Sequence, residues 1–267
     1  MTDLSVLENG TGTPLVLLHA FPLSARMWQR QLTDLPGPDG SRARVIAPDL
    51  PGFGGTPPRT DPPALELLAD DVAGLLDRLG VARAVVGGLS MGGYVAMQFA
   101  RRHPHRLAGL LLADTKAGAD PAPARANRER IAAAVLARDS VRLLVEERME
   151  ETLLAPGTPA ALAAEVRELM ATATPAGAAW AQRAMAARTE AFEVLAGLRV
   201  PAAVVVGAED ALAPPSEAEA MAQALPDVEL TLIPLAGHLS ALEAPEAFTV
   251  AVLGLLRRVE RAGSGPA

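Results

Sequence analysis

The sequence contains no cysteine and few aromatic residues, and both shortages narrow the chemistry open to it. Without cysteine the chain can form no disulfide, no thiolate nucleophile and no thiolate metal site. Aromatic residues make up 3% of the 267 residues, which leaves few candidates for an aromatic wall in a binding cleft. Lysine is also scarce, because Lys116 is the only one and arginine supplies every other cationic side chain. This bias reflects composition and indicates no function by itself.

A strong positive charge and a long apolar run are also missing. The formal net charge is −7 and the arginines are scattered, so the chain offers no basic patch for nucleic acid. No apolar stretch approaches the roughly 20 residues that span a bilayer, and the first residues lack the basic and apolar regions of a signal peptide. We therefore expect a soluble, cytoplasmic protein that binds neither nucleic acid nor membrane.

Short apolar runs alternate with helical patterns along most of the chain. Between the second and third runs, apolar residues recur at helical spacing from Leu65 to Leu79, and Gly80 ends the pattern. Strands that alternate with helices predict an α/β fold built on a mostly parallel sheet. The length and the apolar content suit one large domain with a substantial core. The apolar runs are residues 15–18, 45–46, 85–86, 110–112, 204–206 and 230–233.

Residues 118–189 interrupt this alternation. The segment has no β-branched run and is rich in alanine, arginine and glutamate, with several prolines. It follows the run at 110–112, so it would leave the sheet at the edge where the loops after the strands gather. We predict a helical cap inserted into the fold, which would serve as a lid. The alternative is a helical excursion with a purely structural role.

The sequence Gly-Leu-Ser-Met-Gly at residues 88–92 directly follows the run at 85–86 and precedes a helical stretch. A sharp strand-to-helix turn needs glycine two residues before and two residues after the serine, because a larger side chain would collide where the two backbones approach. The bend would hold the serine hydroxyl clear of its neighbours. The pattern therefore predicts that Ser90 is a nucleophile.

A serine hydroxyl needs a base within hydrogen-bond reach and usually a carboxylate that orients this base. Of the four histidines we favour His238, because it follows the run at 230–233 in a loop that contains glycine. His103 and His105 lie at a charged helix end, where capping of the last carbonyl groups is the simpler explanation. His19 lies after a strand near the same edge of the sheet, in a loop that it could shape.

Two adjacent carboxylates, Glu209 and Asp210, follow the run at 204–206. We expect only one of them to point inward and choose Asp210 as the orienting acid. Asp114, after the run at 110–112, offers an alternative position from which a carboxylate could reach the histidine. The chosen residues follow the chain order serine, acid, histidine, which is associated with one particular sheet topology.

Acyl transfer also builds an oxyanion, and the site must hold hydrogen-bond donors where this charge appears. Two backbone amides are well placed for this role. One belongs to Met91, directly after the candidate nucleophile, and the other to Phe21, in the loop after the run at 15–18. Side-chain identity at these positions should affect the shape of the pocket more than the stabilisation of charge.

Five segments together resemble the motifs of the α/β-hydrolase superfamily. The resemblance implies an α/β-hydrolase fold with a mostly parallel, eight-stranded sheet flanked by helices. One departure is Ala20, which stands where the family usually has glycine. The five segments are residues 19–22 (oxyanion loop), 48–56 (glycine-rich turn), 88–93 (nucleophile elbow), 207–214 (acid loop) and 236–245 (histidine loop).

The same resemblance implies a division of the chain into two parts. Residues 1–117 and 190–267 would form the hydrolase core, and residues 118–189 the variable cap. Within the superfamily the chain is most similar to small bacterial carboxylesterases and 3-oxoadipate enol-lactonases, chiefly through residues 89–94. A serine at position 90 argues against the branches that attack through an aspartate.

We therefore predict a serine hydrolase, without metal or cofactor, that cleaves a small-molecule ester, thioester or lactone through Ser90, His238 and Asp210. The same three residues could instead support lyase, C–C hydrolase or perhydrolase chemistry, because these activities occur on the same fold. A non-catalytic small-molecule receptor on this fold is a third possibility.

The walls of the substrate pocket are harder to read from the sequence. We expect His19, Trp28, Tyr94 and Trp180 to line it, although the aromatic residues could equally belong to the core. Methionines at positions 149, 170 and 185 would suit an adaptable apolar wall, with core packing as the alternative.

Overall fold

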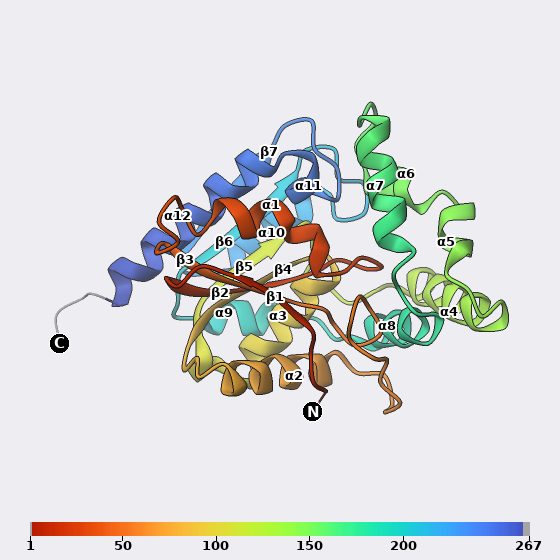
Figure 1. Cartoon of the computed structure of the whole chain (residues 1–267), viewed down its shortest axis with the longest axis horizontal. Helices are drawn as coiled ribbons and strands as arrows, with labels where there is room; N and C mark the ends of the chain where they lie inside the picture. Colours follow the sequence, from red (N-terminus) through yellow and green to blue (C-terminus); the bar gives the residue numbers. More distant parts are fainter. Residues whose placement is uncertain (1, 264–267) are drawn as a thin grey trace.

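A seven-stranded sheet forms the centre of the protein (Figure 1), whose computed structural model describes residues 2–263. The strands follow the order β1-β3-β2-β4-β5-β6-β7. β1 pairs with β3 in antiparallel orientation, and the other neighbouring pairs are parallel. The strands are β1 (Val6–Asn9), β2 (Thr13–Leu18), β3 (Ala43–Pro48), β4 (Ala84–Leu89), β5 (Leu107–Ala113), β6 (Ala202–Gly207) and β7 (Val228–Ile233).

The six apolar runs of the sequence lie within β2 to β7, so the predicted α/β architecture is confirmed. The prediction of eight strands is wrong for the described residues, which form seven. β1 itself had no apolar signal, because its side chains at the sheet edge are exposed or half-buried. It exists through its pairing with β3, where Val6 lies opposite Pro48.

Helices cover both faces of this sheet, as the burial of its central strands requires. On one face α3 (Met91–Arg102) packs on β2, β4 and β5, and α2 (Leu65–Arg78) packs on α3. On the other face α12 (Pro245–Gly263) packs on β5, β6 and β7 (Figure 1). Among the described residues, no helix is both long and apolar enough to cross a membrane. The remaining helices of the two faces are α1 (Gln29–Asp34), α9 (Phe192–Gly197), α10 (Pro215–Ala224) and α11 (Ser240–Glu243).

Residues 118–189, the helical segment, separate β5 from β6 and contain no strand. α4 and α8 pack against each other, and Figure 1 shows α4 to α8 gathered at one end of the molecule. The segment therefore lies beside the carboxyl ends of the strands, because its side chains border one cavity with Ser90 and His238. The helices are α4 (Ala122–Ala137), α5 (Arg142–Glu146), α6 (Met149–Leu153), α7 (Ala160–Met170) and α8 (Pro175–Ala187).

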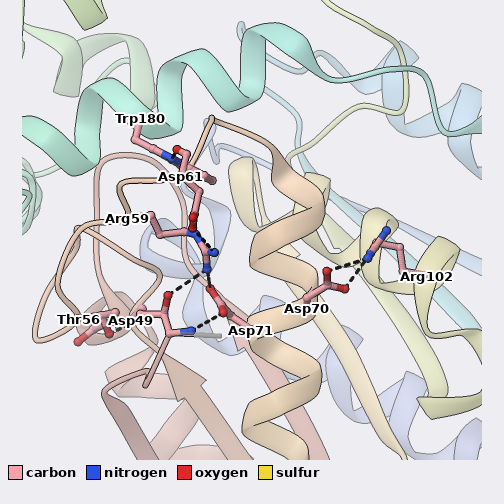
Figure 2. A network of polar contacts seen from close by, with 9 residues as sticks. Asp49, Thr56, Arg59, Asp61, Asp70, Asp71, Arg102 and Trp180 are labelled. Atoms are coloured by element: carbon pink, nitrogen blue, oxygen red, sulfur yellow. Dashed lines mark hydrogen bonds and ion pairs between the residues drawn. The ribbon is translucent and has the colours of Figure 1, made fainter.

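A polar network attaches the helical segment to the core, as Figure 2 shows. The side chain of Arg59 forms ion pairs with Asp71 on α2 and with Asp61, the latter at 2.5 Å. The indole nitrogen of Trp180 on α8 donates to the backbone oxygen of Asp61 at 2.8 Å. One loop, residues 59–61, is therefore held by the core and by the helical segment at the same time.

Candidate active site

Ser90 sits at the turn between β4 and α3, where the chain reverses from strand to helix in a single residue. Its backbone dihedrals are φ 56° and ψ −111°, a conformation that residues with a side chain rarely adopt. The turn is held because the Ser90 amide donates to the Ala113 oxygen on β5 at 2.9 Å. Thr115 adds a second bond, from its hydroxyl to the Ser90 carbonyl oxygen at 2.8 Å. The strained backbone presents the serine side chain at the carboxyl edge of the sheet.

The glycines on either side of Ser90 are required by the close approach of backbones. A Cβ atom on Gly88 would lie 2.4 Å from the carbonyl carbon of Gly92, and one on Gly92 would lie 2.1 Å from the Leu18 oxygen. Both neighbours are backbone atoms that cannot rotate away. The steric reason that we gave for glycine at these two positions is therefore visible in the packing of α3 on β4 and β2.

His238 and Asp210 approach Ser90 from the loops that follow β7 and β6. The His238 Nε2 atom lies 2.8 Å from the Ser90 hydroxyl oxygen, and its Nδ1 atom lies 2.8 Å from Asp210 Oδ2. A carboxylate only accepts hydrogen bonds, so Nδ1 carries the proton and Nε2 is free to accept from the serine. The structure thus brings the three predicted residues into one hydrogen-bonded chain.

The Asp210 carboxylate is held in place by its own loop. Its second oxygen, Oδ1, accepts from the amides of Leu212 and Ala213 at 2.8 and 2.9 Å. Asp210 and His238 are both buried, whereas the adjacent Glu209 is exposed. Only one of the two consecutive carboxylates faces inward, and it is the one in contact with the histidine.

Asp114, the alternative acid, is engaged elsewhere. Its carboxylate accepts from the Gly207 amide at 2.8 Å and from the Ser240 hydroxyl. Burial raises the pKa of Asp114 well above the usual range, against the hydrogen bond from Ser240, and the charge of Asp210 adds to the increase. Asp114 therefore joins the loops after β5, β6 and β7, and Asp210 contacts the histidine.

His19 and His103 have separate partners. The His19 side chain is fully buried, with Nδ1 2.9 Å from the Ala20 oxygen and Nε2 accepting from the Leu50 amide at 2.9 Å. Burial lowers the pKa of His19 to about 4, although the Ala20 hydrogen bond and the charge of Asp49 oppose the change. His19 is thus a neutral residue that joins two loops. His103, at the end of α3, contacts Asp70 at 2.8 Å.

Two backbone amides, those of Met91 and Phe21, are the predicted donors to an oxyanion. Met91 is the first residue of α3, whose opening turn leaves amides without helical acceptors. Phe21 lies in the loop after β2 and borders the same cavity as Ser90. Neither amide donates to an acceptor within residues 2–263. Both remain candidates for the oxyanion hole.

A cavity of about 350 Å³ lies between Ser90, His238 and the helical segment. Of the four predicted pocket residues, Tyr94 lines it and the other three do not. Trp28 is fully buried in the core, where it packs on Phe248 with 5.7 Å between ring centroids. Trp180 faces residues 60–63, and His19 is enclosed between loops. Tertiary contacts with Phe248, with residues 60–63 and with the Leu50 amide hold these three rings away from the cavity.

Most of the cavity wall comes from residues that we did not predict. Met149 and Met185 border it, as expected for an adaptable apolar wall, whereas Met170 does not. The side chains that the helical segment contributes are polar or charged more often than apolar. Among these residues only Lys116 had a signal in the sequence. It follows β5, and the loop after a parallel strand lies at the same edge of the sheet as Ser90. The unpredicted residues are Lys116, Asp120, Ala124, Asn127, Arg128, Arg130, Ile131, Glu147, Thr152, Leu153, Gln182 and Leu212.

Glu243 on α11 holds the loop that carries the histidine. Its Oε1 atom accepts from the amides of Gly237 and Leu239 at 3.0 and 3.2 Å. Its Oε2 atom accepts from the Ala155 amide in the helical segment at 2.8 Å. A single carboxylate therefore connects the loop around His238 to the segment above the cavity.

A mostly parallel sheet with helices on both faces, and a serine, a histidine and an acid at its carboxyl edge, is the arrangement found in α/β hydrolases. The comparison with known families agrees, because the family described as alpha/beta hydrolase fold matches residues 13–245. The chain belongs to this family, which confirms the resemblance of its motifs.

The relatives give a coarse indication of activity. The chain is 34% identical over 260 residues to the pimeloyl-[acyl-carrier protein] methyl ester esterase of Aromatoleum aromaticum, with 91% of this chain and 98% of that protein covered. It is 41% identical to a thermophilic esterase from Thermogutta terrifontis, solved with malate bound, with a TM-score of 0.90 and coverage of 96% and 93%. The enol-lactonase from Burkholderia xenovorans LB400 is 27% identical, with a TM-score of 0.75 and coverage of 96% and 97%. These similarities support a hydrolase that acts on ester bonds in general.

Proposed function

We propose that this protein is a serine hydrolase that cleaves carboxylic esters, thioesters or lactones through an acyl-enzyme. The observation that carries the proposal is the hydrogen-bonded chain from Ser90 through His238 to Asp210, with 2.8 Å at each step. The names of the relatives, which include esterases and an enol-lactonase, agree with chemistry at an ester carbonyl.

In this mechanism the Ser90 oxygen attacks the substrate carbonyl while His238 Nε2 takes the hydroxyl proton. The C–O or C–S bond then breaks, and His238 returns the proton to the leaving alcohol or thiol. A water molecule attacks the acyl-enzyme by the reverse route and releases the acid and free Ser90. Asp210 holds the histidine in the required tautomer and stabilises its positive charge in both steps.

The oxyanion that forms twice in this cycle needs fixed donors. We assign this role to the backbone amides of Met91 and Phe21, and the position of Met91 at the first turn of a helix adds a favourable dipole. In acyl transfer the removal of one such donor costs about 10²- to 10³-fold in kcat. Backbone donors explain why side-chain substitutions at these two positions should alter the shape of the site more than its charge.

We further assign residues 118–189 as a cap whose side chains select the substrate, above a core formed by residues 1–117 and 190–267. This assignment is supported by the cavity, which Ser90 and His238 border from below and α4, α6 and α8 border from above. Differences in acyl-chain preference should therefore follow substitutions in these helices.

The test is the hydrolysis of p-nitrophenyl acetate and butyrate by the wild type and by Ser90→Ala. We expect the variant to lose several orders of magnitude in kcat/KM while its circular dichroism and its unfolding midpoint stay close to those of the wild type. Near wild-type turnover by Ser90→Ala would contradict the mechanism.

Covalent labelling separates the enzyme from a non-catalytic receptor with the same fold. A fluorophosphonate probe should label the wild type stoichiometrically at Ser90 and leave Ser90→Ala unlabelled. Ser140, on the helical segment and outside the cavity, supplies the matched serine control, since Ser140→Ala should retain full labelling. Folded wild-type protein that takes up no probe would favour the receptor.

A further inference from the structure

The cavity beside Ser90 carries more positive than negative charge. Three cationic side chains border it, from Lys116, Arg128 and Arg130, and two acidic ones, from Asp120 and Glu147. This excess is local, because the chain as a whole has a formal net charge of −7. A cationic pocket in an acidic protein needs an explanation in terms of what enters it.

Arg130 is neutralised by a dedicated partner. Its two terminal nitrogens donate to the two oxygens of Glu147, each at 2.9 Å. This bidentate pairing occupies the strong donors of the guanidinium group and neutralises its positive charge with one carboxylate. The charges of Arg130 and Glu147 therefore cancel at the rim of the cavity.

Arg128 shares its acid with a second arginine. The Asp120 carboxylate contacts Arg128 Nε at 2.5 Å and a terminal nitrogen of Arg188 at 2.7 Å. Burial alone would raise the pKa of Asp120, but the hydrogen bonds and charges of Arg188 and Arg128 hold it at about 2. One negative charge thus faces two positive charges, and Arg128 also donates to Gln182 Oε1 at 3.1 Å.

Lys116 has no acidic partner. Among residues 2–263 its ammonium group forms neither an ion pair nor a hydrogen bond, and the side chain is half-buried at the cavity wall. Its position is fixed from behind, because the preceding residue, Thr115, donates to the Ser90 oxygen at 2.8 Å. The only lysine of the chain therefore presents a free cation to the space in which the substrate of Ser90 would lie.

We propose that the substrate carries a carboxylate in addition to the ester bond, and that Lys116 binds this carboxylate. The inference rests on the proposed function. A flexible lysine suits the task because its compact ammonium group can follow carboxylates at somewhat different distances from the carbonyl. The apolar wall formed by Met149, Leu153 and Met185 would take the methylene groups between the two ends.

The test compares esters that differ only in this carboxylate. Monomethyl glutarate and methyl pentanoate have the same chain, with a carboxylate in place of the terminal methyl group on the acyl side. 4-Acetoxybenzoate and 4-methylphenyl acetate make the same exchange on the leaving-group side. For each pair the quantity measured is the ratio of kcat/KM for the charged ester to that for the neutral ester.

We expect Lys116→Met to lower this ratio at least tenfold for one of the two pairs, and the pair affected shows which side of the ester faces Lys116. Lys116→Arg should keep most of the ratio, since it retains the charge. Arg26→Met removes one exposed cation outside this cavity and is the matched control, with an unchanged ratio expected. Ratios that are unaffected in Lys116→Met for both pairs, or that fall equally in Arg26→Met, would overturn the proposal.

A binding measurement makes the result independent of turnover. Calorimetric titration of glutarate into Ser90→Ala should give a dissociation constant that Lys116→Met in the same background raises at least tenfold. Equal affinity in the two proteins would count against Lys116, whether or not the esters are hydrolysed. A wild-type protein that hydrolyses none of these esters, together with Lys116-dependent glutarate binding, would instead refute the proposed function and leave the anion site in place.

Discussion

The carboxylate of Glu243 holds the backbone on both sides of His238, because it accepts hydrogen bonds from the amides of the residues directly before and after the histidine. The same carboxylate also accepts from the Ala155 amide and the Thr158 hydroxyl, at 2.8 and 3.1 Å. The loop of the candidate base is therefore held by an acid that also binds the helical segment. This arrangement makes Glu243 a positioning residue, which acts through the backbone of the histidine loop.

The first prediction concerns Glu243→Gln. An amide side chain has one acceptor oxygen, so it cannot serve the amides around His238 and the helical segment together. Hydrogen bonds to a charged group are worth about 1.5–3 kcal/mol, and we expect kcat for p-nitrophenyl butyrate to fall about 10- to 100-fold, with a smaller change in KM. Glu246→Gln, an exposed acid three residues further along, is the control and should keep wild-type kcat. Equal kcat values for the two variants would show that the loop does not depend on Glu243.

The second prediction concerns the close contact at Gly92. A Cβ atom there would lie 2.1 Å from the Leu18 carbonyl oxygen, and relief of the clash would require α3 to move away from β2. Overpacking of this kind typically costs 1–3 kcal/mol, and we expect Gly92→Ala to lose at least about 2 kcal/mol of unfolding free energy. Gly197→Ala, with nothing within 4 Å of the added carbon, should unfold like the wild type. Urea denaturation measures both, and an unchanged midpoint for Gly92→Ala would contradict the contact.

The third prediction concerns pH and the buried His19. Its pKa falls from 6.5 to about 4 in the folded chain, chiefly through burial. Below pH 6.5 the unfolded chain therefore takes up a proton that the folded chain does not, so His19 lowers the unfolding free energy as the pH falls towards 4. The whole loss amounts to about 3 kcal/mol. His19→Gln keeps an acceptor for the Leu50 amide but cannot titrate.

The measurement is the unfolding free energy of the wild type and of His19→Gln between pH 7 and 4. The difference between the two proteins should shift in favour of the variant as the pH falls. Parallel curves would mean that His19 titrates alike in the folded and unfolded chains.

The fourth prediction compares a buried ion pair with an exposed one. Asp120→Asn leaves Arg128 and Arg188 without their shared charge, and breaking a buried pair in this way typically costs 3–5 kcal/mol. Glu129→Gln breaks the ion pair between Glu129 on α4 and Arg183 on α8. This pair lies on the surface, where solvent screens it, so its loss should have a much smaller effect. Thermal unfolding of both variants tests this difference, which would disappear if α4 and α8 were held by apolar packing alone.

The order of strands and helices was predictable because each element has a local signal. The runs at 85–86 and 204–206 lie in strands that are buried on both faces, so their apolar character is continuous. β1 carries no such signal, since its exposed side chains leave only the backbone pairing with β3 to define it. The eight strands came from the family resemblance and from no local signal in this sequence, and the described residues form seven.

The candidate site divides in the same way. Ser90, Asp210 and His238 each follow a strand at the same edge of the sheet, so their types and positions along the chain indicated that they would meet. The wall of the cavity comes from α4, α6 and α8, whose packing over the sheet no local pattern describes. Trp28 shows the limit, because a large ring after a strand can face the site or the core, and only the position of Phe248 decides it.

The sequence by itself determined the turn at Ser90, because steric clashes at positions 88 and 92 act between neighbouring backbones and leave glycine as the only residue that fits. It also determined the order of serine, acid and histidine along a parallel sheet. The tertiary structure decided what surrounds them, including the enclosure of His238 by Glu243 and the free cation of Lys116. Charges balance between segments that are distant in sequence, so the unpaired one can be recognised only after the chain has folded.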